Sequence, residues 1–339
     1  MAELEFTDEK FTKVDPELKE ILKKHPAGTE NITNIWQMRA MDEECRKQLA
    51  ETILPLPDDV SVTDILIPTR DGTEIDGRVF TPVSVPADYR SLMVFYHSSG
   101  WCMRGVRDDD SLFKILTPKF GCVCVSVDYR LAPESKFPVA HNDAIDSFKW
   151  VASNIEKLGA NPKRGFFLGG ASAGGNFVSV LSHIARDEKI KPELTGLWHM
   201  VPTLIHPADL DEETMAQFRS YKETIHAPVI TPKIMDIFFE NYQPTPKSPL
   251  VNPLYYPTGH KDLPPSFFQC CGWDPLRDEG IAYEKALKAA GNETRLIVYE
   301  GVPHCFWVYY PMLSLRKKYF EDAIDGFTWL LSHVKKEDD

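Results

Sequence analysis

The chain has 339 residues, with 38 Lys and Arg against 50 Asp and Glu, so its formal net charge at pH 7 is −12. Nucleic acids and anionic membrane surfaces are bound by clustered basic residues, and this charge therefore argues against both as partners. Hydrophobic residues make up 43% of the sequence, which argues against disorder over most of the chain. A chain of this length can bury a large core without disulfide or metal staples.

The first twenty residues are acidic and lack the apolar segment of a secretory signal. No apolar stretch approaches the roughly 18 to 20 residues that a membrane-spanning helix needs. The seven cysteines show no C-x-x-C spacing, and we expect them to be buried free thiols rather than disulfides or zinc ligands. These features predict a cytoplasmic protein with no membrane span.

The segment before residue 57 is predicted to consist of helices and linkers. One helix follows Asp15-Pro16-Glu17, and a second covers residues 35–49. The pattern then changes to strands at 64–68 and 75–82, with Asp71-Gly72 as the turn between them. An antiparallel hairpin is therefore expected at one edge of a sheet.

From residue 91 onward, apolar strand-like runs alternate with helical patterns. The predicted strands cover residues 92–97, 122–129, 165–170, 195–201, 266–271 and 294–300. The predicted helices cover residues 109–119, 139–157, 174–187, 279–290 and 315–335. This alternation predicts an α/β fold in which a mostly parallel central sheet has helices on both faces. It is interrupted at about 202–262 by two helical patterns and proline-rich loops, an insertion typical of a cap or lid.

Gly170-Ala171-Ser172-Ala173-Gly174 stands directly between a predicted strand and a predicted helix. In this context G-x-S-x-G indicates a nucleophile elbow, a turn so tight that small residues must flank the serine. The turn would raise Ser172 Oγ above the sheet at the amino end of a helix. The alternative is a glycine-rich turn that contains a serine by chance.

A nucleophilic serine needs a base and an orienting acid, which follow such an elbow in the order Ser, Asp, His. Asp274 and His304 each come just after a predicted late strand. Like Ser172, they are thus placed at the carboxyl ends of parallel strands, where sites in α/β folds gather. Asp278 is the competing acid, and its position favours the cap of the following helix.

The loop after the strand at 92–97 begins with His97-Ser98-Ser99-Gly100-Trp101. Backbone N–H groups there could bind an oxyanion together with the N–H of Ala173, the residue after the nucleophile. His97 would then fix the loop in place rather than act as a base.

Five motifs occur in an order and spacing that resemble the hormone-sensitive-lipase-like branch of the α/β-hydrolases, a group of microbial and fungal carboxylesterases. They are HSSGW (97–101), DYRLAPESKFP (128–138), GASAGG (170–175), DPLRDEG (274–280) and GVPHCF (301–306). The resemblance extends from about residue 64 to the end of the chain.

The resemblance implies an α/β-hydrolase fold with a helical cap and no metal or organic cofactor. It assigns Ser172 as nucleophile, His304 as base and acid, and Asp274 as orienting carboxylate. The oxyanion hole would be formed by Ser99, Gly100 and Ala173. The implied domains are an N-terminal part of the cap (1–56), a core (57–201 and 263–339) and a cap insertion (202–262).

The sequence departs from the family pattern at two places. Ala171 stands where the family has an aspartate before the nucleophile, and Ser98 and Ser99 replace two glycines of the oxyanion loop. The backbone N–H groups of that loop remain. The new hydroxyls could add a donor to the oxyanion or narrow the site. Changed oxyanion loops also occur where this scaffold has moved toward elimination or cyclisation.

The predicted function is that of a carboxylesterase-type serine hydrolase acting on a small-molecule ester with a short-to-medium acyl group, with a secondary metabolite as one candidate. The predicted substrate contacts are aromatic: Trp36, Trp101, Phe238 and Tyr242. The plainer interpretation is that these side chains attach the cap to the core. Three alternatives stay open, namely an amidase or formamidase, a lyase or cyclase, and a binding protein derived from an inactive hydrolase. The amphipathic final helix, with aromatic residues expected at its surface, leaves a homodimer open.

Overall fold

The computed structural model describes residues 11–25, 29–49, 55–98 and 100–334. Within them, eight strands form one sheet in the order β1-β2-β4-β3-β5-β6-β7-β8. The strands are β1 (Val60–Pro68), β2 (Glu74–Pro82), β3 (Ser91–Tyr96), β4 (Cys122–Val127), β5 (Phe166–Ala171), β6 (Gly196–Met200), β7 (Ser266–Trp273) and β8 (Thr294–Pro303). The first two strands are the expected antiparallel hairpin, and β2 is also antiparallel to β4. All remaining pairs are parallel.

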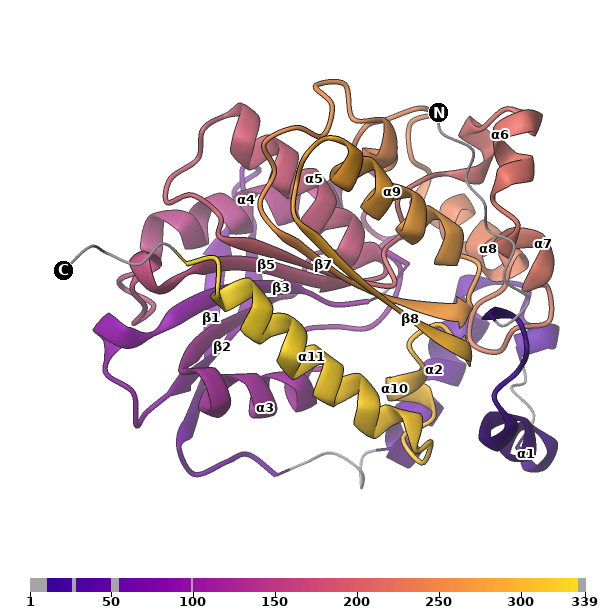
Figure 1. Cartoon of the computed structure of the whole chain (residues 1–339), viewed down its shortest axis with the longest axis horizontal. Coiled ribbons are helices and arrows are strands. Elements are labelled where there is room, and N and C mark those ends of the chain that lie inside the picture. Colours follow the sequence, from indigo (N-terminus) through magenta and orange to yellow (C-terminus); the bar gives the residue numbers. More distant parts are fainter. Residues whose placement is uncertain (1–10, 26–28, 50–54, 99, 335–339) are drawn as a thin grey trace.

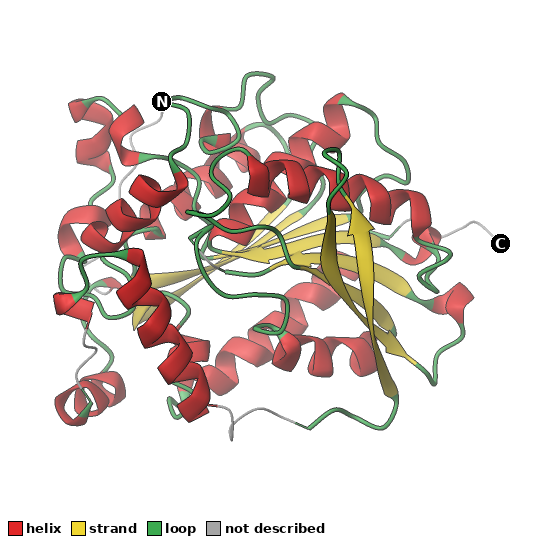
Figure 2. Cartoon of the chain, turned by 180° about the vertical axis from the view of Figure 1, so that it is seen from behind, coloured by secondary structure: helices red, strands yellow, loops and turns green. Residues whose placement is uncertain are grey.

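Helices cover both faces of this sheet (Figures 1 and 2). The helices of the described residues are α1 (Pro16–Lys24), α2 (Ile35–Leu49), α3 (Asp110–Phe120), α4 (Val139–Asn154), α5 (Ala173–Asp187), α6 (Glu212–Gln217), α7 (Ser220–Glu223), α8 (Pro232–Tyr242), α9 (Arg277–Ala289), α10 (Phe306–Tyr309) and α11 (Leu315–Leu331). Helices α3 and α11 pack on one face, and α4, α5 and α9 pack on the other. The predicted α/β fold with a mostly parallel, two-sided sheet is confirmed.

The central strands are buried along their whole length because both of their faces are covered. Every residue of β3, β4, β5 and β6 is buried, whereas β1 and β2 mix buried and exposed positions. This difference explains why continuous apolar runs mark the central strands and a more alternating pattern marks the edge hairpin. All seven cysteines are free thiols, six of them buried and Cys45 half-buried.

The remaining helices gather at one end of the sheet, on the right in Figure 1. Helix α2, from the N-terminal region, packs against α8 from the insertion between β6 and β7. The second helix was predicted with the observed bounds. The first of the two helical patterns expected in the insertion covers residues 209–223, and the structure divides it into α6 and α7, because the backbone at Phe218 (φ −87°, ψ 75°) leaves the helical region.

A short segment before α1, residues 11–15, lies across the ends of β7 and β8, and we call it the N-terminal strap. Its Asp15 N–H donates to the carbonyl oxygen of Gly301 at 3.0 Å. A Cβ atom on Gly301 would lie 2.2 Å from the carbonyl oxygen of Lys13, and one on Gly272 would lie 2.6 Å from that of Phe11. Only residues without a side chain allow the strap to approach these strands so closely.

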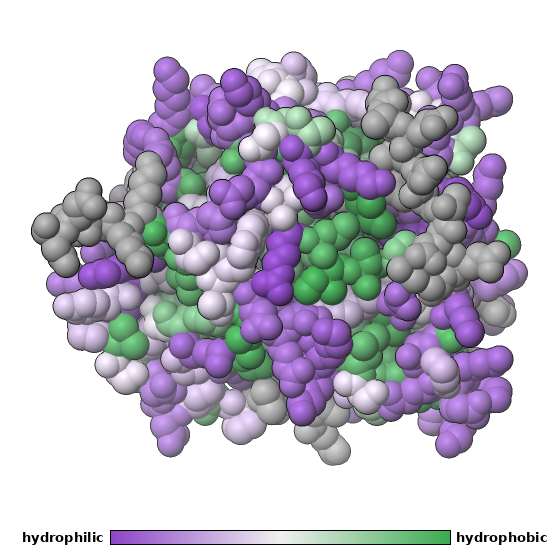
Figure 3. All heavy atoms as spheres, viewed as in Figure 1, coloured by the Kyte–Doolittle hydropathy of each residue, from purple (hydrophilic) through white to green (hydrophobic). Residues whose placement is uncertain are grey.

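The aromatic residues of α11 differ from expectation. Tyr319 and Phe327 are buried, and Phe320 and Trp329 are half-buried, because this helix packs on the sheet. The face in Figure 3 is mostly hydrophilic, with smaller apolar areas between polar side chains. Among the described residues, no helix is long and apolar enough to span a bilayer.

Candidate active site

Ser172 occupies the sharp turn between β5 and α5. Its backbone has φ 56° and ψ −117°, a strained conformation for a residue with a side chain. The flanking glycines make the turn possible, since a Cβ on Gly170 would lie 2.4 Å from the carbonyl oxygen of Gly174. A Cβ on Gly174 would lie 1.9 Å from the carbonyl oxygen of Tyr96. The elbow is therefore built against the end of β3, and its glycines are required by contact.

Asp274 and His304 follow directly after β7 and β8, and the structure brings them together. His304 Nδ1 lies 2.7 Å from Asp274 Oδ2, while Asp274 Oδ1 accepts a hydrogen bond from the Leu276 N–H at 2.9 Å. Both side chains are buried. With Nδ1 donating to the carboxylate, Nε2 of the imidazole is left as its proton acceptor.

Effects of opposite sign act on the pKa of His304. Burial lowers it, because the charged imidazolium is poorly solvated. Burial is the largest single effect, but the Asp274 carboxylate and the Cys305 side chain both raise the pKa and together outweigh it, so the pKa of His304 lies above its ordinary value, at about 10. This pairing is the orientation and charge stabilisation that a catalytic histidine requires.

Asp278, the competing acid, is buried but points elsewhere. Its Oδ2 accepts from the Ser220 N–H at 2.7 Å, and its Oδ1 accepts from Arg277 Nε at 2.7 Å. The predicted capping role is wrong: α9 begins at Arg277, so Asp278 already lies in its first turn. The carboxylate instead joins α9 to α7.

Two of the three predicted oxyanion-hole residues are described by the structure. Ala173 is the first residue of α5, where the backbone N–H has no acceptor within the helix. Gly100 has φ 54°, and a Cβ there would lie 2.5 Å from the Phe238 ring. The third, Ser99, lies outside the described residues. His97 stacks on Tyr129, whose hydroxyl donates to the carbonyl oxygen of His97 at 2.7 Å, so this histidine anchors the loop.

Ser172 and His304 face one small cavity of about 20 Å³. Apolar side chains form most of its wall, and α2, α8 and the oxyanion loop all contribute. The remaining lining residues are Met38, Ser98, Gly100, Met103, Arg104, Val229, Ile230, Met235, Phe238, Cys305 and Tyr309. Ser172 and His304 thus share one small, largely apolar chamber.

Comparison with known proteins identifies the architecture. Residues 93–308, more than half of the chain, match a family described by the alpha/beta hydrolase fold. The chain belongs to the α/β-hydrolase family. A versiconal hemiacetal acetate esterase of Dothistroma septosporum is 28% identical over 302 residues, covering 88% of this chain and 89% of the relative. An arylesterase of Saccharolobus solfataricus is 30% identical over 297 residues, covering 86% and 92%.

The crystal structure of a vibralactone cyclase matches this α/β-hydrolase with a TM-score of 0.91 and 35% sequence identity. The match covers 99% of this chain and 100% of the cyclase. The resemblance to the hormone-sensitive-lipase-like branch is thereby confirmed.

Of the four aromatic side chains predicted to contact substrate, the structure brings only Phe238 to the cavity of this hydrolase. Trp101 and Tyr242 stack on each other with centroids 4.9 Å apart, and the Tyr242 hydroxyl lies 2.6 Å from His141 Nδ1. They join α8 to the core, in line with the plainer interpretation. Trp36 is 57% exposed and lies against Arg39.

Arg104 is a cavity residue of the hydrolase that sequence reasoning missed. Its side chain is 4% exposed, and its Nη2 lies 3.0 Å from Asp42 Oδ1. In the sequence, Arg104 directly follows the apolar pair Cys102-Met103. This pattern does not show that the guanidinium turns inward.

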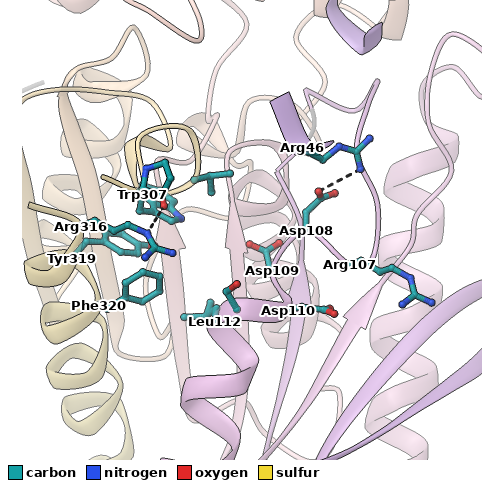
Figure 4. Close-up of a pocket in the computed structure, with 13 residues that line it drawn as sticks. Arg46, Arg107, Asp108, Asp109, Asp110, Leu112, Trp307, Arg316, Tyr319 and Phe320 are labelled. Atoms are coloured by element: carbon teal, nitrogen blue, oxygen red, sulfur yellow. Dashed lines mark hydrogen bonds and ion pairs between the residues drawn. The ribbon is translucent and has the colours of Figure 1, made fainter. Parts of the chain in front are cut away.

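A larger cavity of about 270 Å³ lies outside the catalytic chamber of the hydrolase, bounded by α3, α10, α11 and the loop before α3 (Figure 4). Arg46 and Asp108 form an ion pair of 3.6 Å at its wall, and Arg316 Nε donates to the carbonyl oxygen of Trp307 at 2.9 Å. Ser172, Asp274 and His304 are not among the residues that line it.

Proposed function

We propose that this α/β-hydrolase cleaves carboxylic esters through Ser172, His304 and Asp274. The observation that carries the proposal is the placement of Ser172 and His304 in one cavity, with the histidine held by a 2.7 Å bond to a buried carboxylate. The esterases among the relatives support the same chemistry.

In the proposed mechanism, His304 Nε2 takes the proton of Ser172 Oγ as this oxygen attacks the ester carbonyl carbon. The N–H groups of Gly100, Ala173 and Ser99 bind the oxygen that becomes negative. His304 then gives the proton to the leaving alkoxide, which departs as an alcohol and leaves an acyl-serine. Water, deprotonated by His304, attacks this acyl group, and the proton returns to Ser172 as the acid leaves. Asp274 holds the imidazole in place and stabilises its charged form.

The proposed substrate is a small-molecule ester with a short-to-medium acyl group. A cavity of about 20 Å³ with apolar walls favours the short end of this range. The relative that acts on versiconal hemiacetal acetate supports the ester of a secondary metabolite as the natural substrate. Six buried free thiols suit a reducing compartment, so we place the enzyme in the cytoplasm. Residues 1–56 and 202–262 are proposed to form its cap.

Initial rates on p-nitrophenyl acetate, butyrate, octanoate and laurate test the proposal. We expect turnover that peaks at short or medium acyl chains and that the Ser172→Ala variant abolishes. We expect Ser172→Ala to leave the elbow intact, because it removes only one hydroxyl. Circular dichroism of both proteins checks that they have the same fold. A folded wild type that neither hydrolyses an ester nor is labelled at Ser172 by an organophosphonate would overturn the proposal.

Ring closure without hydrolysis is a second candidate function. The similarity to a vibralactone cyclase over 99% of the chain favours it. The two reactions differ in their products, since hydrolysis releases one equivalent of acid and incorporates one solvent oxygen. Titration of released acid, together with mass spectrometry in H₂¹⁸O, separates them. The same measurement on formamides tests the amidase alternative.

A further inference from the structure

Arg104 is held at the catalytic cavity against two unfavourable effects. Its backbone φ is 73°, in the left-handed region that favours glycine. Its side chain is almost completely buried, although burying a charge is costly unless partners compensate it. Strained residues with buried charges cluster at functional sites, so this combination calls for a functional explanation.

The charge of Arg104 is already balanced within the protein. Asp42 of α2 binds its Nη2, and the ring of Tyr309 lies 4.9 Å from its guanidinium carbon. Asp42 also pairs with Arg46 at 3.1 Å, and Arg46 meets Asp108 at the wall of the larger cavity (Figure 4). Arg104 therefore needs no anionic substrate as its counter-ion.

Arg104 also contacts Ser98, one of the two serines that replace family glycines. Arg104 Nη1 lies 3.4 Å from Ser98 Oγ. Because a guanidinium has no acceptor, Ser98 Oγ must accept this bond, and its own hydrogen must point away from Arg104. Ser98 lines the cavity that contains Ser172 and His304. Within the part of the chain that the structure describes, no group accepts that hydrogen.

Ser98 is also fixed close to the nucleophile. A Cβ on Gly174 of the elbow would lie 1.9 Å from the carbonyl oxygen of Tyr96 and 2.9 Å from that of His97. The residue before Ser98 is thus packed against the turn that carries Ser172. The described oxyanion donors, Gly100 and Ala173, come from these same two segments.

We propose that the Ser98 hydroxyl is a further donor to the oxyanion and that Arg104 is the positioning residue that turns this hydroxyl into the cavity. The inference rests on the proposed function. As negative charge grows on the former carbonyl oxygen, Ser98 donates a hydrogen bond to it. Ser98 forms no covalent bond to the substrate and keeps its own proton. A hydroxyl that accepts from a charged donor is itself a stronger donor, since such bonds polarise one another.

Kinetics of Ser98→Ala and Ser98→Gly on p-nitrophenyl butyrate test the role of Ser98. Loss of one oxyanion donor typically lowers kcat by about 10²–10³, and for a donor that supplements backbone groups we expect about 10–100-fold. KM should stay within about twofold, because the bond forms in the transition state. A trifluoromethyl ketone, which forms a tetrahedral oxyanion on Ser172, should bind these variants more weakly by the same factor as the loss in kcat/KM.

Ser126→Ala is the matched control. The Ser126 hydroxyl donates to the carbonyl oxygen of Val106 at 3.1 Å and so supports the same loop from outside the cavity. This variant should lower the melting temperature without lowering kcat. If both Ser98 variants keep kcat and ketone affinity within twofold of wild type, or lose only stability as Ser126→Ala does, the inference is wrong.

The positioning role of Arg104 is tested in a charge-neutral background. Arg104→Met combined with Asp42→Asn removes the donor without leaving a buried carboxylate unpaired. We expect this pair to lower kcat by the same factor as Ser98→Ala, with no further loss when all three changes are combined. Arg104→Lys, which keeps the charge beside Asp42, should recover most of the activity. Independent, multiplying losses would overturn the role of Arg104.

Ketone binding also separates the two proposals. A wild type that binds the ketone at Ser172 but hydrolyses no ester would refute the proposed ester hydrolysis and still measure Ser98 through ketone affinity. A wild type that does neither would overturn both.

Discussion

In the proposed mechanism His304 must be neutral to accept the proton of Ser172, yet its contact with Asp274 favours the charged form. Burial, the largest single effect, lowers its pKa, but Asp274 and Cys305 together raise it by more, so the pKa lies above the ordinary value of 6.5. At neutral pH the resting enzyme therefore holds much of its histidine as imidazolium. Raising the pH through this pKa removes that proton and produces the active base.

This titration predicts an ascending limb in the pH profile of kcat/KM. The rate should rise with pH, with the midpoint of the rise above 6.5. In Asp274→Asn the raising influence of the carboxylate is lost while burial remains, so the midpoint should move to lower pH. The plateau should fall by about 10³–10⁴, as when the orienting carboxylate of a serine triad is removed. A midpoint that does not move in Asp274→Asn would contradict the assigned pairing.

The residues of the proposed triad could be located from the sequence because each is marked by its immediate neighbours. A G-x-S-x-G turn between a strand and a helix is a local pattern, and Asp274 and His304 each follow a strand end. Arg104 and Trp101 are different, since their orientation depends on α2 and α8. A sequence does not show whether a side chain in a loop points into the cavity or packs against helices such as α2 and α8.

At the scale of elements, α8 forms part of the wall of the chamber that Ser172 and His304 share. Its Phe238 ring occupies the space that a Cβ on Gly100 would need, and the side chain is buried. The next residue, Phe239, is equally buried but packs on His206, with ring centroids 4.0 Å apart, and on Trp101. Phe238 therefore lines the chamber, whereas Phe239 packs against aromatic residues away from it.

This division predicts different effects of the same substitution at the two positions. Phe238→Leu should enlarge the chamber and move the preferred p-nitrophenyl ester to a longer acyl chain, with at least a threefold change in relative kcat/KM. Phe239→Leu, the matched control, should cost about 1–2 kcal/mol of stability and leave the chain-length profile unchanged. Identical profiles for both variants would show that Phe238 does not limit acyl length.

Helices and strands could be predicted from the sequence where their burial produces a regular pattern of apolar residues. Strands covered on both faces are continuous apolar runs, and α2 has one amphipathic periodicity from end to end. The pattern over 209–223 is similar, but the structure interrupts the helix at Phe218, a buried residue with a non-helical backbone. The helical periodicity of the sequence does not show this interruption.

At the scale of the whole molecule, the N-terminal strap and the catalytic loops depend on one another. Asp274 and His304 stand at the ends of β7 and β8, and the strap lies across these same ends through Gly272 and Gly301. The strap thus supports the base and its carboxylate from outside the cavity. Loosening it should disturb their geometry without touching them.

Gly301→Ala and Gly259→Ala separate this contact from simple backbone strain. Both glycines have positive φ, 66° and 68°, but a Cβ on Gly259 meets no atom within 4 Å, whereas one on Gly301 meets the strap at 2.2 Å. We expect Gly259→Ala to cost about 1 kcal/mol of unfolding free energy and to leave kcat unchanged. Gly301→Ala should cost about 2–4 kcal/mol and lower kcat. Chemical denaturation and initial rates measure both, and equal effects would refute the role of the strap.

The strap has a consequence for synthesis. The strap is translated before every strand of the sheet, yet the surface on which it docks belongs to β7 and β8, the last two of these strands to be made. Contacts between distant parts of a sequence form late and slowly. A nascent chain can therefore complete the elbow of Ser172 long before it holds Asp274 and His304. The site proposed for acyl transfer can assemble only after β8 has been made and the strap has reached its docking surface.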